Sequence, residues 1–295
     1  MVLLIRENLK ELTTLSSSEQ EVAANILKLG IEIKDMSVRE LASYSYTSTS
    51  AVTRLCNKLG FKGYKDFKIA FLNEEEYIND YFNKIDANFP FSKDDNLARV
   101  CHSIAHLYEE TCKDTLSLVD YPRLIHATTL LYKATHIYII CIGVGLDLAK
   151  VFADRMMRIG KTVIVSDNPN NQFYYTYHAK KDECFIFISY TGTTLRTRQY
   201  FKNVVNSPAK TILITSIGEN CLSQDADVVL RMTTREKLYS NIGSFSTSVS
   251  IMLVLDLLYS SFFHKNYDEA FKLKKQFSLD YEYNRSSDNE VMKED

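Results

Sequence analysis

The sequence predicts an all-α head joined to an α/β body that holds a parallel sheet in three layers. Within residues 1–78, apolar side chains recur at helical spacing and no strand-like alternation appears. From about residue 107 onward, short runs rich in Val and Ile alternate with helical patterns, as in a parallel sheet covered on both faces. With 295 residues, 45% of them hydrophobic, the chain is long enough for two compact domains and is neither collagen-like nor disordered.

The net charge, the cysteine pattern and the apolar runs limit which kinds of site and which location the sequence allows. The formal net charge is −2, so affinity for nucleic acid would need a local basic patch. The six cysteines form no C-x-x-C pair and have no zinc-ligand spacing with histidine, so we expect no metal, no cofactor and no disulfide scaffold. The longest apolar run, Val249–Phe263, contains Asp256 and is shorter than the about 20 residues that a membrane span needs. We expect a cytoplasmic protein.

The sequence predicts that the head consists of several short helices. Ser16–Glu19 and Ser37–Glu40 both fit a capping box, and Gly30 is a plausible stop for the helix that follows the first box. Ser48 is the expected N-cap of a third helix. The apolar face of this third helix is formed by Val52, Leu55, Cys56 and Leu59.

The opposite face of the third helix is polar and basic. Two short helices joined by a tight turn, with the second polar outward, favour a helix-turn-helix that inserts its second helix into the major groove of DNA. Hydroxyl groups and Arg54 would reach base edges, and the lysines would meet phosphates. The candidate DNA-binding residues are Ser48, Thr49, Ser50, Thr53, Arg54, Lys58, Lys62 and Lys65. The same pattern also fits an ordinary amphipathic helix with a solvated basic face.

The remaining elements are expected in the following order. Residues 79–106 form a linker, 107–264 the α/β domain and 265–295 a charged tail. A helix over Glu109–Lys133 leads into the first strand, and a nearly all-apolar helix over Ser244–Phe263 lies in a core or a subunit interface. The expected strands are His136–Ile142, Thr162–Asp167, Glu183–Ser189, Thr211–Ser216 and Val228–Met232, with helices over Asp147–Ile159 and Leu195–Val205 between them.

Two strand-to-helix loops of the body could hold an anion. The first contains Gly143 and Gly145; the second is formed by Ser189, Tyr190, Thr191, Gly192, Thr193 and Thr194. Small and hydroxylated residues let backbone amides and hydroxyls converge on a phosphate at a helix N-terminus. Both loops could instead be tight turns without a ligand. A dinucleotide site is a weaker alternative, because the third glycine of that fingerprint falls at Leu148.

Three segments of the head are distinctive, namely Ser37–Ala42, Thr53–Gly60 and Phe61–Lys68. Together they resemble the N-terminal domain of RpiR-type bacterial transcription regulators. The resemblance implies DNA binding. The family commonly has glycine in the turn where this chain has Tyr46, and a left-handed backbone there would strain tyrosine, so we expect the turn to be rebuilt.

Two segments of the body, Ile188–Thr194 and the segment around Glu236, carry a second resemblance. They are similar to the Ile-Ser-x-Ser-Gly-x-Thr phosphate loop and to the segment with a sugar-contacting glutamate in the sugar isomerase (SIS) domain, the usual partner of that head. The first loop departs from the pattern, because Leu146-Asp147 follows Gly145 where a serine is usual. The resemblance implies a regulator of carbohydrate metabolism that senses a phosphorylated sugar and binds double-stranded operator DNA as a homodimer or a dimer of dimers.

Two alternatives remain open. The chain could be a sugar-phosphate isomerase with an accessory helical domain, which would need a general base near the substrate carbon. Glu236 is the candidate for that base, and the histidines are scattered outside any motif. Alternatively, the SIS-like domain could serve only to dimerise the protein. We expect a regulator with no catalytic residues.

Overall fold

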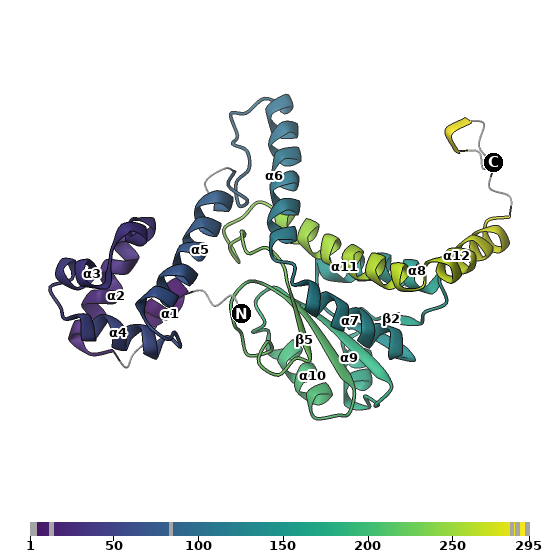
Figure 1. The fold of residues 1–295 in the computed structure, drawn as a ribbon. Coiled ribbons are helices and arrows are strands. Elements are labelled where there is room, and N and C mark those ends of the chain that lie inside the picture. Colours follow the sequence, from purple (N-terminus) through teal and green to yellow (C-terminus); the bar gives the residue numbers. More distant parts are fainter. Residues whose placement is uncertain (1–4, 12–14, 83–84, 284–285, 287–289, 293–295) are drawn as a thin grey trace. The chain divides into compact units, whose positions relative to one another are not determined.

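The computed structural model describes residues 5–11, 15–82, 85–283, 286 and 290–292 (Figure 1). The chain falls into two compact units. Unit 1 comprises Met1–Glu110 with two short segments, Ile217–Glu219 and Tyr239–Ile242. Unit 2 comprises the rest of the chain, from Thr111 onward. Each unit has a hydrophobic core of its own, and each is described separately.

The head in unit 1 is all-helical, as the sequence predicts. Both capping boxes are present, and Ser48 accepts a hydrogen bond from the amide of Ala51 as the third expected cap. Gly30 ends the α-helix, but the chain continues as a 3-10 helix. The elements are α1 (Ile5–Glu11), α2 (Ser17–Leu29), the 3-10 helix η1 (Gly30–Asp35), α3 (Val38–Tyr44), α4 (Thr49–Lys58) and α5 (Tyr64–Phe82).

The core of the head lies between these helices. Val52, Leu55 and Cys56 of α4 are buried, as their spacing predicts. They belong to one apolar cluster with Ile26 of α2 and Phe67 of α5. At roughly 1.5–3 kcal/mol for each large apolar side chain fully buried, this cluster is what holds α4 in place and leaves its polar face outward.

The segment between head and sheet differs from the expected linker and helix. The expected single helix over Glu109–Lys133 is two helices, α6 (Leu97–Ser117) and α7 (Tyr121–Lys133). Asp120 separates them, because its side chain caps α7 through the amide of Arg123. The expected junction between residues 106 and 107 falls inside α6, and the division between the two units lies at Glu110 in the same helix.

Unit 2 is built on a parallel five-stranded sheet with strand order β2-β1-β3-β4-β5 (Figure 1). In register, Ile139 of β1 lies opposite Ile186 of β3. All five strands lie where the apolar runs predict them. They are β1 (His136–Ile140), β2 (Val163–Val165), β3 (Glu183–Ser189), β4 (Lys210–Thr215) and β5 (Val228–Arg231).

Helices cover both faces of this sheet, as expected for a three-layer arrangement. One core cluster joins alternate strand residues, such as Ile186, to α7, α8 (Val144–Met157) and α11 (Phe245–Lys265). The other joins the intervening residues, such as Phe187, to α10 (Leu195–Val205) and to Tyr175 of α9 (Pro169–Tyr177). The sequence analysis did not identify α9, whose apolar periodicity is weak.

The two C-terminal helices differ in character. α11 passes the length and composition test for a membrane span, but Val254 and Leu258 are buried in the core against the sheet. The segment expected as a charged tail begins with a helix, α12 (Tyr267–Tyr281). Its Phe271 and Phe277 are partly exposed.

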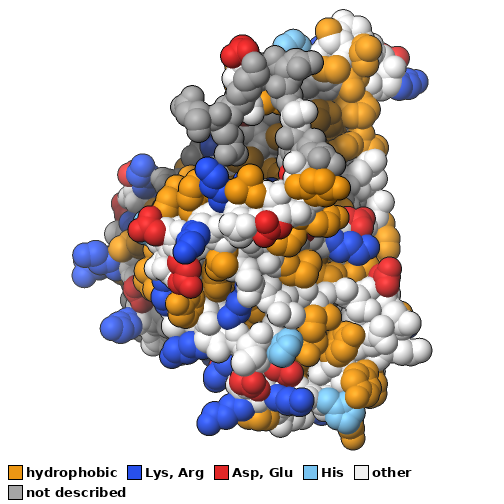
Figure 2. Space-filling view, turned by 90° about the vertical axis from the view of Figure 1, so that its right-hand side faces the viewer, with side chains coloured by type: hydrophobic (Ala, Val, Ile, Leu, Met, Phe, Trp, Pro, Cys, Tyr) orange, Lys and Arg blue, Asp and Glu red, His pale blue; other side chains and the backbone are white. Residues whose placement is uncertain are grey.

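Figure 2 shows hydrophobic side chains interspersed with charged ones on one face of the molecule.

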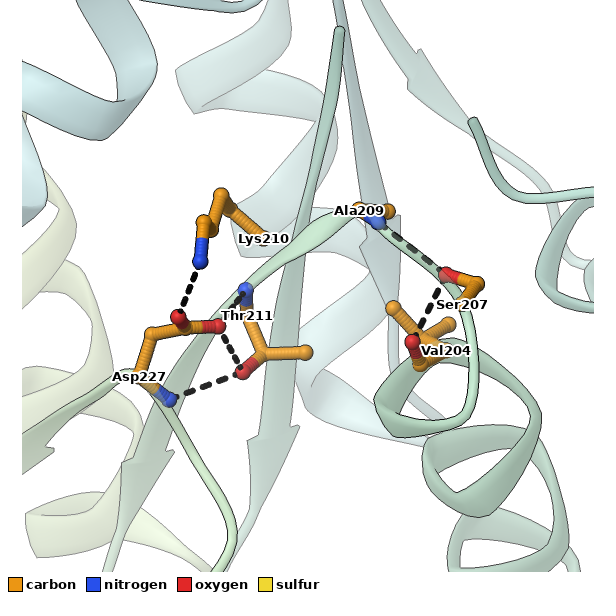
Figure 3. A network of polar contacts seen from close by, with 6 residues as sticks. All are labelled: Val204, Ser207, Ala209, Lys210, Thr211 and Asp227. Atoms are coloured by element: carbon orange, nitrogen blue, oxygen red, sulfur yellow. Dashed lines mark hydrogen bonds and ion pairs between the residues drawn. The ribbon is translucent and has the colours of Figure 1, made fainter. Parts of the chain in front are cut away.

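A polar network joins the amino ends of β4 and β5 (Figure 3). The Asp227 carboxylate accepts hydrogen bonds from Lys210 Nζ at 2.8 Å, and from the Thr211 amide and hydroxyl at 2.9 Å each. The Asp227 amide donates to Thr211 Oγ1 at 2.9 Å. The network lies at the edge of the sheet opposite the two candidate loops, so its role is to pair the two strands.

Candidate functional site

The turn between α3 and α4 keeps a left-handed residue at the position of Tyr46. Tyr46 has φ +51°, the only positive φ of a non-glycine residue in the described part of the chain. Its amide donates to Ser43 O, and the Thr47 amide donates to Ala42 O, which are the two bonds of a Schellman motif. The expectation of a rebuilt turn is therefore wrong. The two hydrogen bonds and the packing of α3 and α4 hold tyrosine in a conformation that glycine usually adopts.

The polar face of α4 is open to solvent. Ser48 is occupied as the N-cap, and Thr53 Oγ1 donates to the Thr49 carbonyl at 3.0 Å. All eight candidate DNA-binding residues are exposed, namely Ser48, Thr49, Ser50, Thr53, Arg54 and Lys58 around α4, and Lys62 and Lys65 after it. The structure thus brings a row of hydroxyls and four cations together beside a short turn, which is the arrangement that a helix-turn-helix uses.

Glu19 lies buried behind this surface, and the sequence analysis assigned it only to a capping box. Its buried carboxylate lies 2.7 Å from Lys58 Nζ and 3.5 Å from Arg54 Nε. It also accepts the Ser16 amide at 2.8 Å. The hydrogen bonds from Lys58 and Ser16 lower the pKa of Glu19 to about 2. One carboxylate therefore caps α2 and positions two cations of α4.

The two candidate loops of unit 2 lie at the carboxyl edge of the sheet, after β1 and after β3. These strands are neighbours, and the strand order reverses between them. In open parallel sheets this switch point is where ligands bind. Gly143 has φ +62° at the N-cap of α8, and Gly145 is buried. Asp147, which follows them, is exposed and pairs with Lys150 at 3.5 Å.

The second loop is ordered by its own hydroxyls at the start of α10. Ser189 Oγ accepts the Gly192 amide at 3.2 Å, and Thr191 Oγ1 accepts both the amide and the hydroxyl of Thr193. Thr194 is the N-cap of α10, and its side chain makes no capping bond in the structure. Amides at the N-terminus of this 11-residue helix carry partial positive charge, which favours an anion.

Residues after β4 pack behind this loop, and the sequence analysis did not identify them. Asn220 Nδ2 donates to Thr215 Oγ1 at 3.0 Å, and Thr215 Oγ1 donates to the Ser189 carbonyl at 2.7 Å. Gly192 has φ +64°, and a Cβ there would lie 2.3 Å from Asn220. Glycine is therefore required at this position both by the backbone and by the close approach of Asn220.

Further polar groups flank the loops. Buried Gln172 of α9 donates to the carbonyls of Cys141 and Ser166 at 3.0 and 2.6 Å, which fixes the chain after β1 and β2. A cavity of about 380 Å³ opens beside the start of α10; it is lined by Pro169, Asn170, Phe173, Leu195, Arg196, Gln199 and Tyr200. Neither feature carries a sequence motif. Gln172 joins the ends of two strands across α9, and the cavity forms where α9 and α10 pack side by side.

Glu236 lies after β5, and its carboxylate caps α11. It accepts the amides of Ser246 and Thr247 at 2.7 and 3.2 Å, and the Thr247 hydroxyl as well. Tyr190 of the second loop reaches the same residue, since its hydroxyl donates to the Glu236 carbonyl at 2.8 Å. The structure therefore brings Glu236 to the second loop, but with both carboxylate oxygens already bonded.

Comparison with known proteins agrees with the two-part organisation. Residues 2–76 match the model of the rpiR-family helix-turn-helix domain, and residues 130–261 match the SIS domain. An uncharacterized HTH-type transcriptional regulator of Clostridium perfringens is 25% identical over 81% of this chain and 84% of its own. A second, of Haemophilus influenzae, is 25% identical over 89% of this chain and 91% of its own.

A solved structure gives the same fold over nearly the whole chain. The Vibrio vulnificus NanR protein, complexed with ManNAc-6P, covers 96% of this chain and 100% of its own, with a TM-score of 0.61 and 20% identity. The helical head and the parallel sheet of the structure thus correspond to the two domains that the family models match. The chain therefore belongs to the RpiR-type family of transcriptional regulators, with an N-terminal helix-turn-helix domain followed by a SIS domain.

Proposed function

We propose that this regulator binds operator DNA through α4 and senses a phosphorylated sugar at the Ser189–Thr194 loop of its SIS domain. The observation that carries the proposal is the loop itself. It combines four serine and threonine hydroxyls, a glycine at φ +64° and the N-terminus of α10 at the switch point of a parallel sheet. Such a loop can offer several donors to one phosphate, and bonds to a charged acceptor are roughly twice as strong as neutral ones.

The chemical class of the effector follows from the loop and from a similar protein. NanR of Vibrio vulnificus, which has the same fold, is described in complex with ManNAc-6P. A hexosamine 6-phosphate is therefore the first probe for this chain. The exposed, Lys150-paired position of Asp147 supports the proposal, because it keeps that carboxylate from opposing an anion at the first loop.

Sensing fits the site better than isomerisation does. Isomerisation needs a positioned base within reach of a substrate carbon. Both carboxylate oxygens of Glu236 accept hydrogen bonds from the start of α11. The six histidines are all exposed, and none belongs to the hydrogen-bonded groups that surround the loop. The residues at the site can hold a ligand, but they present no free acid–base pair.

The effector site is tested by thermal unfolding with a panel of sugar phosphates that includes ManNAc-6P. A ligand that binds the native state raises its stability by mass action, by about 2.7 kcal/mol at 100 times Kd. Ser189→Ala with Thr191→Ala should remove the rise. Thr129→Ala with Ser260→Ala, which removes two hydroxyls outside the loop, should leave it intact. A rise that is the same in both double variants would place the phosphate elsewhere.

The DNA surface is tested with an operator selected from random duplexes. Arg54→Ala should lose about 1–3 kcal/mol of specific binding, because a bidentate base contact is lost. Lys62→Ala and Lys65→Ala should weaken binding to all sequences alike and reduce the salt dependence. Lys272→Ala on α12 is the control and should bind as the parent does. Unchanged binding by all three head variants would contradict this placement.

A further inference from the structure

The candidate loop is joined to α11 through a single tyrosine. Tyr190 Oη donates to the Glu236 carbonyl at 2.8 Å and accepts the Glu236 amide at 3.2 Å. Burial raises the pKa of Tyr190 to about 12, so the hydroxyl keeps its proton at neutral pH. A residue of the loop thus fixes the backbone of the residue whose carboxylate caps the next long helix.

The contact on the other side of Glu236 is specific to the first turn of α11. Its carboxylate accepts hydrogen bonds from the backbone amides of Ser246 and Thr247. As amides of the first turn, these two have no acceptor inside the helix. Ser244 is the formal N-cap, but its side chain makes no capping bond. The order of the first turn of α11 therefore depends on Glu236, a residue from a different segment.

From α11 the contacts continue to the C-terminal half of α6. Ser246 Oγ accepts the Thr111 hydroxyl at 3.0 Å, and Ser250 Oγ accepts the Thr115 hydroxyl at 2.8 Å. All four residues are buried. Buried hydroxyl pairs hold one register, because a shift would leave buried donors without partners. α6 begins at Leu97 in unit 1, so it is the helix through which the chain passes from the head into unit 2.

We propose that Tyr190 and Glu236 form a relay that transmits occupation of the Ser189–Thr194 loop to the first turn of α11 and, through the two hydroxyl pairs, to α6. Glu236 is then a positioning residue that couples the effector to the helix between the domains. The relay rests on the proposed function, because it presupposes a phosphate at the loop. A ligand that fixes the loop fixes the Tyr190 hydroxyl, and with it the cap of α11.

Hydrogen exchange of the full-length protein tests the relay. The probes are inorganic phosphate and ManNAc-6P, with chloride at matched ionic strength as the blank. We expect slower exchange in peptides over 189–194, and slower exchange by about fivefold or more in peptides over 244–250 and 111–117. Fivefold is the lower end of typical coupling between two sites.

The variant Tyr190→Phe removes the hydroxyl that starts the relay. At probe concentrations that give the same protection over 189–194 as in the parent, the slowing over 244–250 should disappear. Tyr64→Phe in the head is the matched control, because its hydroxyl also donates to a backbone carbonyl, that of Met36 at 3.2 Å, away from the loop and from Glu236. It should retain the slowing.

The outcomes separate the two proposals. Protection over 189–194 without any change over 244–250 in the parent overturns the relay and leaves the phosphate site standing. Slowing over 244–250 that survives in Tyr190→Phe also overturns it. If neither probe protects 189–194, the phosphate site fails and the relay fails with it.

Discussion

Tyr46 and Gly60 occupy equivalent positions at the ends of two successive helices. Both have positive φ, +51° and +87°, and both are followed by the pair of hydrogen bonds of a Schellman motif. Gly60 meets the backbone requirement without strain, whereas Tyr46 does not. The Tyr46 side chain is 96% exposed, so no burial offsets that cost. The strain is therefore held by the packing of the α3–α4 pair.

Exchanging the residue types at these positions should have opposite effects. Tyr46→Gly should stabilise the head by about 1 kcal/mol, the cost of a left-handed backbone for a residue with a Cβ. Gly60→Ala should destabilise it by a similar amount, since a Cβ there would meet no atom within 4 Å and strain is the only cost. Native-state hydrogen exchange over residues 38–58 measures both. Destabilisation by Tyr46→Gly would mean that the tyrosine ring makes a contact in solution.

Glu19 gives the head an acid-sensitive contact. Its folded pKa of about 2 lies below the ordinary 4.5. The contact thus contributes fully above about pH 4.5 and is lost as the pH falls toward 2. Glu19→Gln should be less stable than the parent at pH 7, and its stability should fall less between pH 5 and 2. Urea titrations at several pH values, followed by helical circular dichroism, measure both. Parallel pH profiles would contradict the assignment.

At the scale of elements, the two edges of the sheet have different tasks. The carboxyl edge carries the candidate loops, whereas the amino edge carries the Asp227 network that pairs β4 with β5. Burial alone would raise the pKa of Asp227, but the hydrogen bonds from Lys210 and Thr211 outweigh it and lower the pKa. The carboxylate therefore stabilises the fold above its unfolded pKa, and this contribution is lost as the pH falls through the folded value.

Asp227→Asn should separate stability from ligand binding. We expect a loss of about 1–3 kcal/mol, because hydrogen bonds to a charged group are lost. The rise in unfolding temperature produced by ManNAc-6P or another active sugar phosphate should remain as large as in the parent, since the network lies at the opposite edge. Thermal unfolding with and without the ligand measures both. A diminished ligand-induced rise would mean that the amino edge contributes to the site.

At the scale of the whole molecule, we expect operator binding to need more than one copy of the chain. Helix-turn-helix proteins bind operators with two half-sites about one DNA turn apart, and each half-site is contacted by one head. We therefore expect an assembly with two-fold symmetry. Light scattering should give a mass that is two or four times 34.0 kDa. A monomer at the concentrations that bind operator would contradict this expectation.

Coupling between effector and operator is the corresponding test of regulation. The effector should shift operator affinity by roughly 5–150-fold, and the operator should shift effector affinity by the same factor. Titrations of operator with and without the sugar phosphate, followed by the reciprocal titrations, measure the two factors. Equal operator affinities in both titrations would leave the SIS domain as a dimerisation module alone.

The parts of the structure that depend on local patterns could be predicted from the sequence. Both capping boxes, the exposed face of α4, the five strands and the start of α10 were predictable, because apolar periodicity and cap residues act over a few positions. The remaining contacts depend on how separate elements pack. Packing joined Glu19 to Lys58, 39 residues apart, and Tyr190 to Glu236, 46 apart. It also kept Tyr46 left-handed against its local preference. These contacts form only when separate elements pack, and packing energy, summed over a core, exceeds the preference of any one residue.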